Sequence, residues 1–181
     1  TVAARKLQDL LRALPEEAQL TVDGTLNRMT LRAGRSRFNL QALPAGDYPR
    51  ISVGQDQVQT LALPQREFRG LLKSAEFAMA QQDIRYYLNG MLLVIDKGTL
   101  QAVATDGHRL ALADRALAED AAGLTGGVII PRKGLAELKR LADEDDADEI
   151  ELAFEGNSGL ARKGSVTLVM RLIEGDFPNY R

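Results

Sequence analysis

The segment Thr105-Asp106-Gly107-His108-Arg109-Leu110 lies between two short runs of β-forming residues, at 100–105 and 109–113. Asp106-Gly107 favours a tight turn, because aspartate and glycine tolerate the backbone angles that two-residue hairpin loops require. A further β-forming run at 92–96 comes just before them, behind a Lys97-Gly98 turn. The stretch therefore predicts an antiparallel meander of three strands.

A helix is predicted ahead of this meander, at 65–80. Its apolar residues, Phe68, Leu71 and Leu72 among them, recur at helical spacing, and Pro64 suits the entry to a first turn. Two more amphipathic helices are predicted at 4–14 and 132–142. The remaining strands are predicted at 18–23, 26–33, 35–43, 128–131, about 148–154, 158–163 and 165–173.

The chain contains an internal repeat. Arg5-Lys6 opens one predicted helix and Arg132-Lys133 opens another 127 residues later, while Gly46-Asp47-Tyr48-Pro49 returns 129 residues later as Gly175-Asp176-Phe177-Pro178. Two matches in the same order at nearly one offset predict a repeated domain of about 125 to 130 residues. Within each repeated domain, the elements are expected to form modules that each consist of a strand, a helix and three antiparallel strands. This arrangement gives an α+β fold. The turn-rich stretch 44–54 puts the domain boundary near residue 56.

Charge is distributed unevenly over these elements. The helices predicted at 4–14, 65–80 and 132–142 carry about +2, +1 and +3, whereas the whole chain carries −2. If the helices line one face, that face is a positive surface on an acidic body, which attracts phosphates without base contacts. Surface helices commonly carry lysine and arginine, so charge alone leaves both interpretations open.

Composition excludes several classes of protein. The 181 residues are 45% hydrophobic, enough for a sizeable core, and they include no cysteine, which excludes disulfides and thiolate metal sites. The longest apolar stretches, 91–95 and 128–131, are far too short to span a membrane, so a cytoplasmic protein is expected. Thr1 directly precedes a residue of strand character, Val2, which favours a fragment of a longer protein.

Catalytic chemistry has little support. His108 is the single histidine, and Asp106 and the acidic run 143–149 suggest a metal-dependent nuclease or phosphatase as the alternative function. However, the chain offers no second histidine, no Gly-x-Ser-x-Gly elbow and no phosphate-binding glycine loop. We interpret Asp106-Gly107 as a turn and the acidic run as a solvated loop, and we expect no catalytic residue, no metal and no cofactor.

In an extended segment the adjacent Tyr86 and Tyr87 would face opposite ways.

Four motifs resemble the second domain of the bacterial DNA polymerase sliding clamp, the beta subunit of DNA polymerase III. They are Arg85-Tyr86-Tyr87-Leu88-Asn89-Gly90, Val103 to Leu110, Pro131-Arg132-Lys133 and Gly175 to Arg181. The resemblance implies the DNA clamp fold, in which helices lie on one face of antiparallel sheets. It assigns residues 1–56 to the second half of a first clamp domain and 57–181 to a nearly complete second domain, with a third domain absent.

The resemblance also implies a function. The family consists of non-catalytic processivity factors of DNA replication, in which a homodimeric ring encircles double-stranded DNA regardless of its sequence. The ring tethers DNA polymerase III, the clamp loader and other proteins that carry a clamp-binding motif. No membrane partner is implied.

Three groups of site residues follow from the resemblance. A hydrophobic pocket for partner peptides would comprise Arg85, Tyr87, Leu88, Thr105, Gly107, His108, Arg109, Leu110 and Pro178. The surface facing DNA would comprise Arg5, Arg66, Lys73, Gln82, Tyr86, Tyr87, Arg132 and Lys133. The edge that meets a second subunit would comprise Lys6, Arg35, Arg37 and Leu40.

Overall fold

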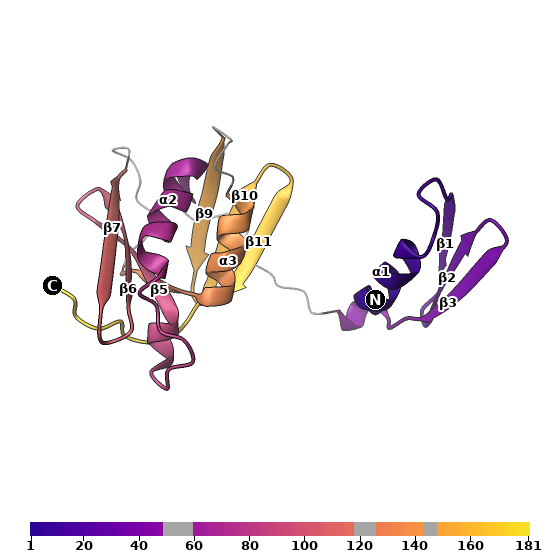
Figure 1. Ribbon diagram of the computed structural model, residues 1–181, viewed down its shortest axis with the longest axis horizontal. Coiled ribbons are helices and arrows are strands. Elements are labelled where there is room, and N and C mark those ends of the chain that lie inside the picture. The colour runs from indigo at the N-terminus through magenta and orange to yellow at the C-terminus, as the bar shows by residue number, and fades with distance from the viewer. Residues whose placement is uncertain (49–59, 118–125, 143–147) are drawn as a thin grey trace. The chain divides into compact units, whose positions relative to one another are not determined.

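The computed structural model describes residues 1–48, 60–117, 126–142 and 148–181 (Figure 1). The chain forms two compact units, Thr1–Ile51 and Ser52–Arg181. The boundary predicted near residue 56 lies outside the described residues. Each unit is described by itself.

The first unit is one helix with a three-stranded antiparallel sheet. Its elements are α1 (Ala4–Arg12), β1 (Leu20–Gly24), β2 (Arg28–Ala33), β3 (Ser36–Gln41) and a 3-10 turn at Ala45–Asp47. The strands follow the order β1-β2-β3, so β3 is an edge. Leu31 and Ala33 of β2 are buried, whereas every residue of α1 stays at least partly exposed. Val2 bridges Ala42 just beyond β3, which ties the start of the chain to the sheet.

The second unit has two modules of the predicted kind. The first contains β4 (Thr60–Pro64), α2 (Gln65–Glu76), a 3-10 turn η2 (Tyr86–Asn89), β5 (Gly90–Asp96), β6 (Thr99–Thr105) and β7 (Leu110–Ala116). The second contains β8 (Val128–Pro131), α3 (Arg132–Leu141), β9 (Glu149–Glu155), β10 (Ser158–Lys163) and β11 (Val166–Arg171). The predicted α+β class and the helices on one face of antiparallel sheets are confirmed.

The two modules exchange their first strands. In the described part of this unit the sheets have the orders β7-β6-β5-β8 and β11-β10-β9-β4. β4 therefore completes the sheet of the second module, pairing Leu61 with Leu152, and β8 completes the sheet of the first, pairing Ile130 with Met91. The unit consequently has an approximate internal twofold arrangement.

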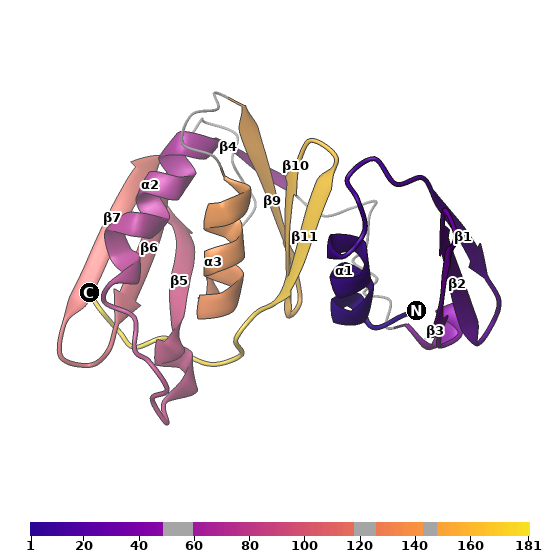
Figure 2. The same ribbon diagram turned by 45° about the vertical axis from the view of Figure 1, so that its right-hand side comes forward.

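Helices α2 and α3 lie side by side over one face of these sheets (Figure 2). Phe68 and Leu72 of α2 and Leu138 of α3 are at most 1% exposed and form the centre of the main core. Burying each such side chain stabilises the fold by about 1.5–3 kcal/mol. The apolar stripes of the predicted helices thus decide which face of the sheets is covered.

A smaller apolar cluster lies on the opposite face of the β5 sheet. Strand alternation sends Met91 and Leu93 to the helices, whereas Leu92 points to this second cluster with Val103 and Ile129. The C-terminal segment 174–181 covers the cluster with two aromatic rings, from Phe177 and Tyr180. The hydroxyl of Tyr180 donates to Gln101 of β6 over 3.2 Å, and Arg181 pairs with Asp96 over 2.9 Å.

Three details differ from the sequence-based expectations. α2 ends at Glu76 rather than residue 80, because the amides of Ala78 and Met79 bond carbonyls three residues back in a tighter turn. The extended geometry expected for Tyr86 and Tyr87 is wrong, since both lie in η2. No strand was predicted at residues 60–64, where the structure has β4. Among the described helices, none is long and apolar enough to cross a membrane.

Candidate functional site

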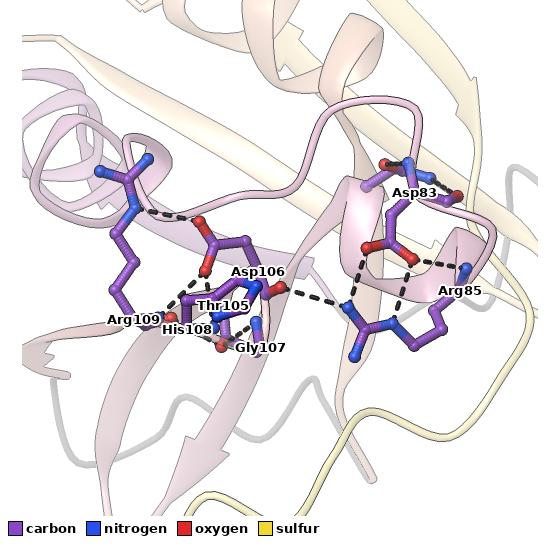
Figure 3. A network of polar contacts seen from close by, with 8 residues as sticks. Asp83, Arg85, Thr105, Asp106, Gly107, His108 and Arg109 are labelled. Atoms are coloured by element: carbon purple, nitrogen blue, oxygen red, sulfur yellow. Dashed lines mark hydrogen bonds and ion pairs between the residues drawn. The ribbon is translucent and has the colours of Figure 1, made fainter.

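The turn between β6 and β7 is built around the carboxylate of Asp106 (Figure 3). Its Oδ1 accepts the backbone N–H groups of His108 at 2.9 Å and Arg109 at 3.0 Å, and its Oδ2 accepts Arg109 Nε at 3.1 Å. These backbone N–H donors, followed by the Arg109 side chain, lower the pKa of Asp106. The aspartate therefore acts as the cap of a turn, which fixes the direction in which His108 and Arg109 leave it.

Thr105 and Gly107 complete this turn. The buried hydroxyl of Thr105 donates to the backbone oxygen of Arg109 over 2.7 Å and accepts the N–H of Gly107 over 3.1 Å. Gly107 has φ +89°, which side-chain-bearing residues rarely adopt. A Cβ there would lie 3.0 Å from Nη1 of Arg85, so glycine also makes room for that guanidinium.

Arg85 connects the turn to the loop before η2. Its Nε and Nη2 donate to the two carboxylate oxygens of Asp83, and Nη2 also donates to the backbone oxygen of Asp106 over 3.3 Å (Figure 3). The side-chain and then the backbone hydrogen bonds from Arg85 lower the pKa of Asp83 to about 2. Asn89 secures the same loop, because its side chain bonds both the N–H and the carbonyl of Asp83. The guanidinium is thus held on one side by a carboxylate and lies against the turn on the other.

Exposed apolar side chains lie next to this polar network. Leu110 and Leu112 begin β7 and are 47% and 45% exposed, and Phe77, just after α2, is 59% exposed. The guanidinium carbon of Arg109 lies 5.8 Å from the centre of the Phe77 ring, which joins α2 to the turn. A rigid turn with apolar side chains and two arginines offers both contact area and hydrogen-bond donors to a partner.

The structure brings most of the predicted peptide-pocket residues together, but not all. Arg85 and the segment from Thr105 to Leu110 are adjacent. Leu88, at 1% exposed, is buried, and half-buried Tyr87 packs against the cluster under the C-terminal segment. Pro178 is an exposed residue of that segment. These three residues therefore do not join the exposed apolar side chains at the turn.

The predicted DNA-facing residues are mostly exposed. Arg66 and Lys73 are seven residues apart and share one face of α2, and Lys133 is exposed on α3. Arg132 is exposed as well, but its Nη2 donates to the backbone oxygens of Met79 and Ala80, both at 3.2 Å. The remaining residues are exposed Arg5 on α1, Gln82 with φ +54°, 57% exposed Tyr86 and half-buried Tyr87.

The predicted subunit-interface residues lie on or beside the β3 edge of the first unit. Lys6 and Leu40 line a groove between the start of α1 and β3. Arg37 is exposed on β3, and Arg35 is exposed in the turn before it.

Sequence reasoning missed Asp83, Asn89 and Phe77. A signal for Asp83 exists: an aspartate two residues before Arg85 is the spacing of an Asx turn, and its carboxylate accepts the Arg85 N–H over 2.8 Å. No comparable sequence signal exists for Phe77, because an aromatic residue at the end of an apolar helix pattern looks the same in the sequence as a buried core residue.

The metal-dependent alternative gains nothing from the geometry. Both carboxylate oxygens of Asp106 are occupied by the turn. Within residues 1–48, 60–117, 126–142 and 148–181, no group of three or more histidine, cysteine or carboxylate side chains could hold a metal ion. Most of the acidic run, residues 143–147, lies outside the described part of the chain.

Both units match known families. Residues 62–179 match the family described as the DNA polymerase III beta subunit, central domain, and residues 1–52 match its N-terminal domain. The beta sliding clamp of Vibrio cholerae serotype O1 is 46% identical over 183 residues, covering 100% of this chain and 48% of the relative. The chain spans about half the length of the curated relatives it matches.

Solved structures agree with this similarity. The DNA polymerase III subunit beta from Pseudomonas aeruginosa is 40% identical with a TM-score of 0.86, covering 99% of this chain and 48% of that one. A sliding clamp from the same organism, solved bound to griselimycin, is 40% identical with a TM-score of 0.82 and the same coverage.

Proposed function

The chain belongs to the DNA polymerase III beta subunit family, the bacterial sliding clamps, and we propose that it acts in DNA replication as part of such a clamp. Residues 1–56 would supply the second half of a first clamp domain and 57–181 nearly all of a second. The protein would be non-catalytic and would assemble as a homodimeric ring around double-stranded DNA, using the β3 edge with Lys6, Arg35, Arg37 and Leu40 as one contact between subunits.

Contact with DNA would come from the exposed cations of the helices. Arg66 and Lys73 on α2 and Lys133 on α3 are exposed. Lysine and arginine attract phosphates without distinguishing bases, so they hold a duplex while letting it slide. Arg5, Gln82, Tyr86 and Tyr87 would add contacts near the duplex.

Partner binding would use the β6–β7 turn. The observation that carries this part of the proposal is the Arg85–Asp83 pair bonded to the Asp106 backbone beside exposed Leu110 and Leu112. Short hydrophobic motifs of DNA polymerase III, the clamp loader and other clamp-binding proteins fit such a surface, because apolar anchors supply affinity and fixed donors supply orientation.

Partner binding is tested by titrating griselimycin into the isotope-labelled chain and following backbone NMR signals. We expect shifts concentrated at Gly107, His108 and Leu110, and an affinity lower than that of the Pseudomonas aeruginosa clamp that is solved with this compound. Shifts confined to residues remote from the turn would contradict the partner site. Saturable binding at the turn would support it.

The ring is tested with DNA topology. A protein that contains this chain should remain on nicked circular duplex DNA and leave it after linearisation, because retention by a ring depends on topology rather than affinity. Equal retention on both forms would contradict the ring proposal.

The non-catalytic proposal fails if Mg²⁺ or Mn²⁺ elicits hydrolysis of DNA or phosphate esters that is lost in His108→Ala.

A further inference from the structure

Two arginines hold α2 and α3 together in a reciprocal way. Arg132, the first residue of α3, donates to the carbonyl oxygens of Met79 and Ala80, which follow α2. Arg69, in α2, donates to the carbonyl oxygens of Lys139 at 2.9 Å and Ala142 at 2.8 Å, at the end of α3. The start of α3 is therefore bonded to the segment that follows α2, and the first half of α2 is bonded to the end of α3.

The two Arg69 bonds fall where cations stabilise a helix most, at the end of α3, whereas the Met79 and Ala80 carbonyls lie in the turn beyond the end of α2 at Glu76. The last carbonyl groups of a helix lack partners in their own helix and carry a partial negative charge. Arg132 bonds two carbonyl oxygens through one nitrogen, Nη2, whose two N–H groups are fixed in the guanidinium plane. A lysine ammonium also has several N–H donors, but it lies on a shorter side chain and its N–H groups have no such fixed plane. Arg132 thus contributes a specific geometry as well as charge.

A continuous series of hydrogen bonds leads from Arg132 to the β6–β7 turn. Ala80, whose carbonyl Arg132 bonds, donates its own N–H to Leu88 over 3.0 Å, and the Leu88 N–H bonds the Arg85 carbonyl over 2.9 Å. Arg85 then donates to the Asp106 backbone. The loop that carries Arg85 is therefore fixed at its start by α3 and at its end by the turn.

We propose that Arg132 is a positioning residue of the partner-binding site: by holding the Met79 and Ala80 carbonyls it fixes the 80–88 loop and thereby places Arg85 against the turn. Its role rests on the proposed function and departs from the phosphate contact that the sequence suggested. Arg132 acts through backbone bonds, and neighbouring Lys133 makes the phosphate contact at this end of α3.

The test compares Arg132→Lys and Arg132→Gln with Arg140→Gln as the matched control. Arg140 is on the same helix, its side chain is 82% exposed, and it forms an ion pair with Glu137 of its own helix. Two quantities are measured without DNA: hydrogen exchange at the amides of Ala80 and Leu88, and affinity for griselimycin. Arg132→Lys keeps the charge on a shorter side chain without the coplanar N–H pair of Nη2, whereas Arg132→Gln also removes the charge.

We expect both Arg132 variants to accelerate exchange at Ala80 and Leu88 about tenfold or more, because hydrogen bonds from charged donors are stronger than those between neutral groups. Both should weaken griselimycin binding severalfold, while Arg140→Gln matches the parent in both measurements. If both Arg132 variants match the parent instead, the two bonds from Arg132 do not hold the loop and the proposal is wrong. Faster exchange with unchanged griselimycin affinity would overturn the link to the turn.

Failure of the clamp function itself gives a different pattern. A parent chain that does not bind griselimycin, combined with protected amides at Ala80 and Leu88 that Arg132→Lys exposes, would count against the partner site while supporting the loop-holding role. Unchanged protection in both Arg132 variants overturns the positioning role whether or not any ligand binds.

Discussion

Arg85 bonds both carboxylate oxygens of Asp83 with its guanidinium, at 3.0 and 2.8 Å, and adds its own backbone N–H at 2.8 Å. Three bonds between residues two positions apart leave the arginine little rotational freedom. Its guanidinium is consequently presented to Gly107 and Asp106 before any partner arrives, which lowers the entropy cost of binding.

The pH dependence of this pair follows from its pKa. Because the Arg85 bonds lower the pKa of Asp83 from 3.8 to about 2, the folded state favours the ionised form. The stabilisation is present above the unfolded pKa and is lost as pH falls toward 2. Carbon-detected NMR titration should give an Asp83 midpoint near 2, and Arg85→Gln should move it upward. A midpoint near 3.8 in the parent would show that the pair does not persist in solution.

Gly107→Ala should lower the free energy of unfolding by more than the unfavourable backbone angle alone accounts for. The angle accounts for about 1–2 kcal/mol of stability, and the added Cβ also displaces the Arg85 guanidinium. Gly98→Ala is the control, because Gly98 has φ +75° with open space around its Cβ position. Urea unfolding should find both variants destabilised, and only Gly107→Ala should also weaken griselimycin binding. Equal griselimycin affinity of the two variants would show that displacing the Arg85 guanidinium does not affect the partner site.

Gly90 and Gly70 should respond to alanine in opposite directions. A Cβ at Gly90 would lie 2.5 Å from Ile129 Cγ2 and 2.9 Å from the Ile130 backbone oxygen, so overpacking should cost about 1–3 kcal/mol or more. At Gly70 of α2 nothing lies within 4 Å, and alanine should stabilise the helix by about 1 kcal/mol. Unfolding midpoints followed by circular dichroism check both signs. A stable Gly90→Ala would contradict the close pairing of β5 with β8.

The exposed arginine and lysine side chains of the helices should contribute to the salt dependence of DNA binding. Arg66→Gln and Lys133→Gln should each reduce the slope of log affinity against log salt by about 0.9 for duplex DNA, independent of sequence. Arg171→Gln, on β11 with its side chain 80% exposed, should leave the slope unchanged. Fluorescence anisotropy with duplexes of two sequences measures this. Slopes that fall equally in all three variants would indicate general attraction rather than a helix surface.

Local sequence signals predicted the elements well where a single pattern controls the backbone. The Asp106-Gly107 turn and the α3 helix were predicted to within a residue or two, because turn chemistry and an apolar stripe act over short distances. The end of α2 was not, since its apolar pattern continues through Met79 while the backbone tightens after Glu76. Hydrophobic periodicity does not report that change.

Long-range relations were beyond the sequence. No local pattern states that β4 pairs with β9, or that Arg132 reaches the carbonyls after α2. A basic residue opening a helix looks the same whether it meets a phosphate or a neighbouring helix, so Arg132 and Lys133 were assigned alike. The structure separates them because the Arg132 side chain donates to the carbonyl oxygens of Met79 and Ala80.

The exchange of strands between the two modules has a consequence for synthesis of the protein. β4 emerges from the ribosome early, but its partner, β9, is complete only after Glu155. Until then the nascent chain carries an open strand edge, a template for pairing with other chains. Pairing between segments so distant also slows folding. We therefore expect the second unit to acquire its fold late, as one cooperative body, when translation is nearly past it.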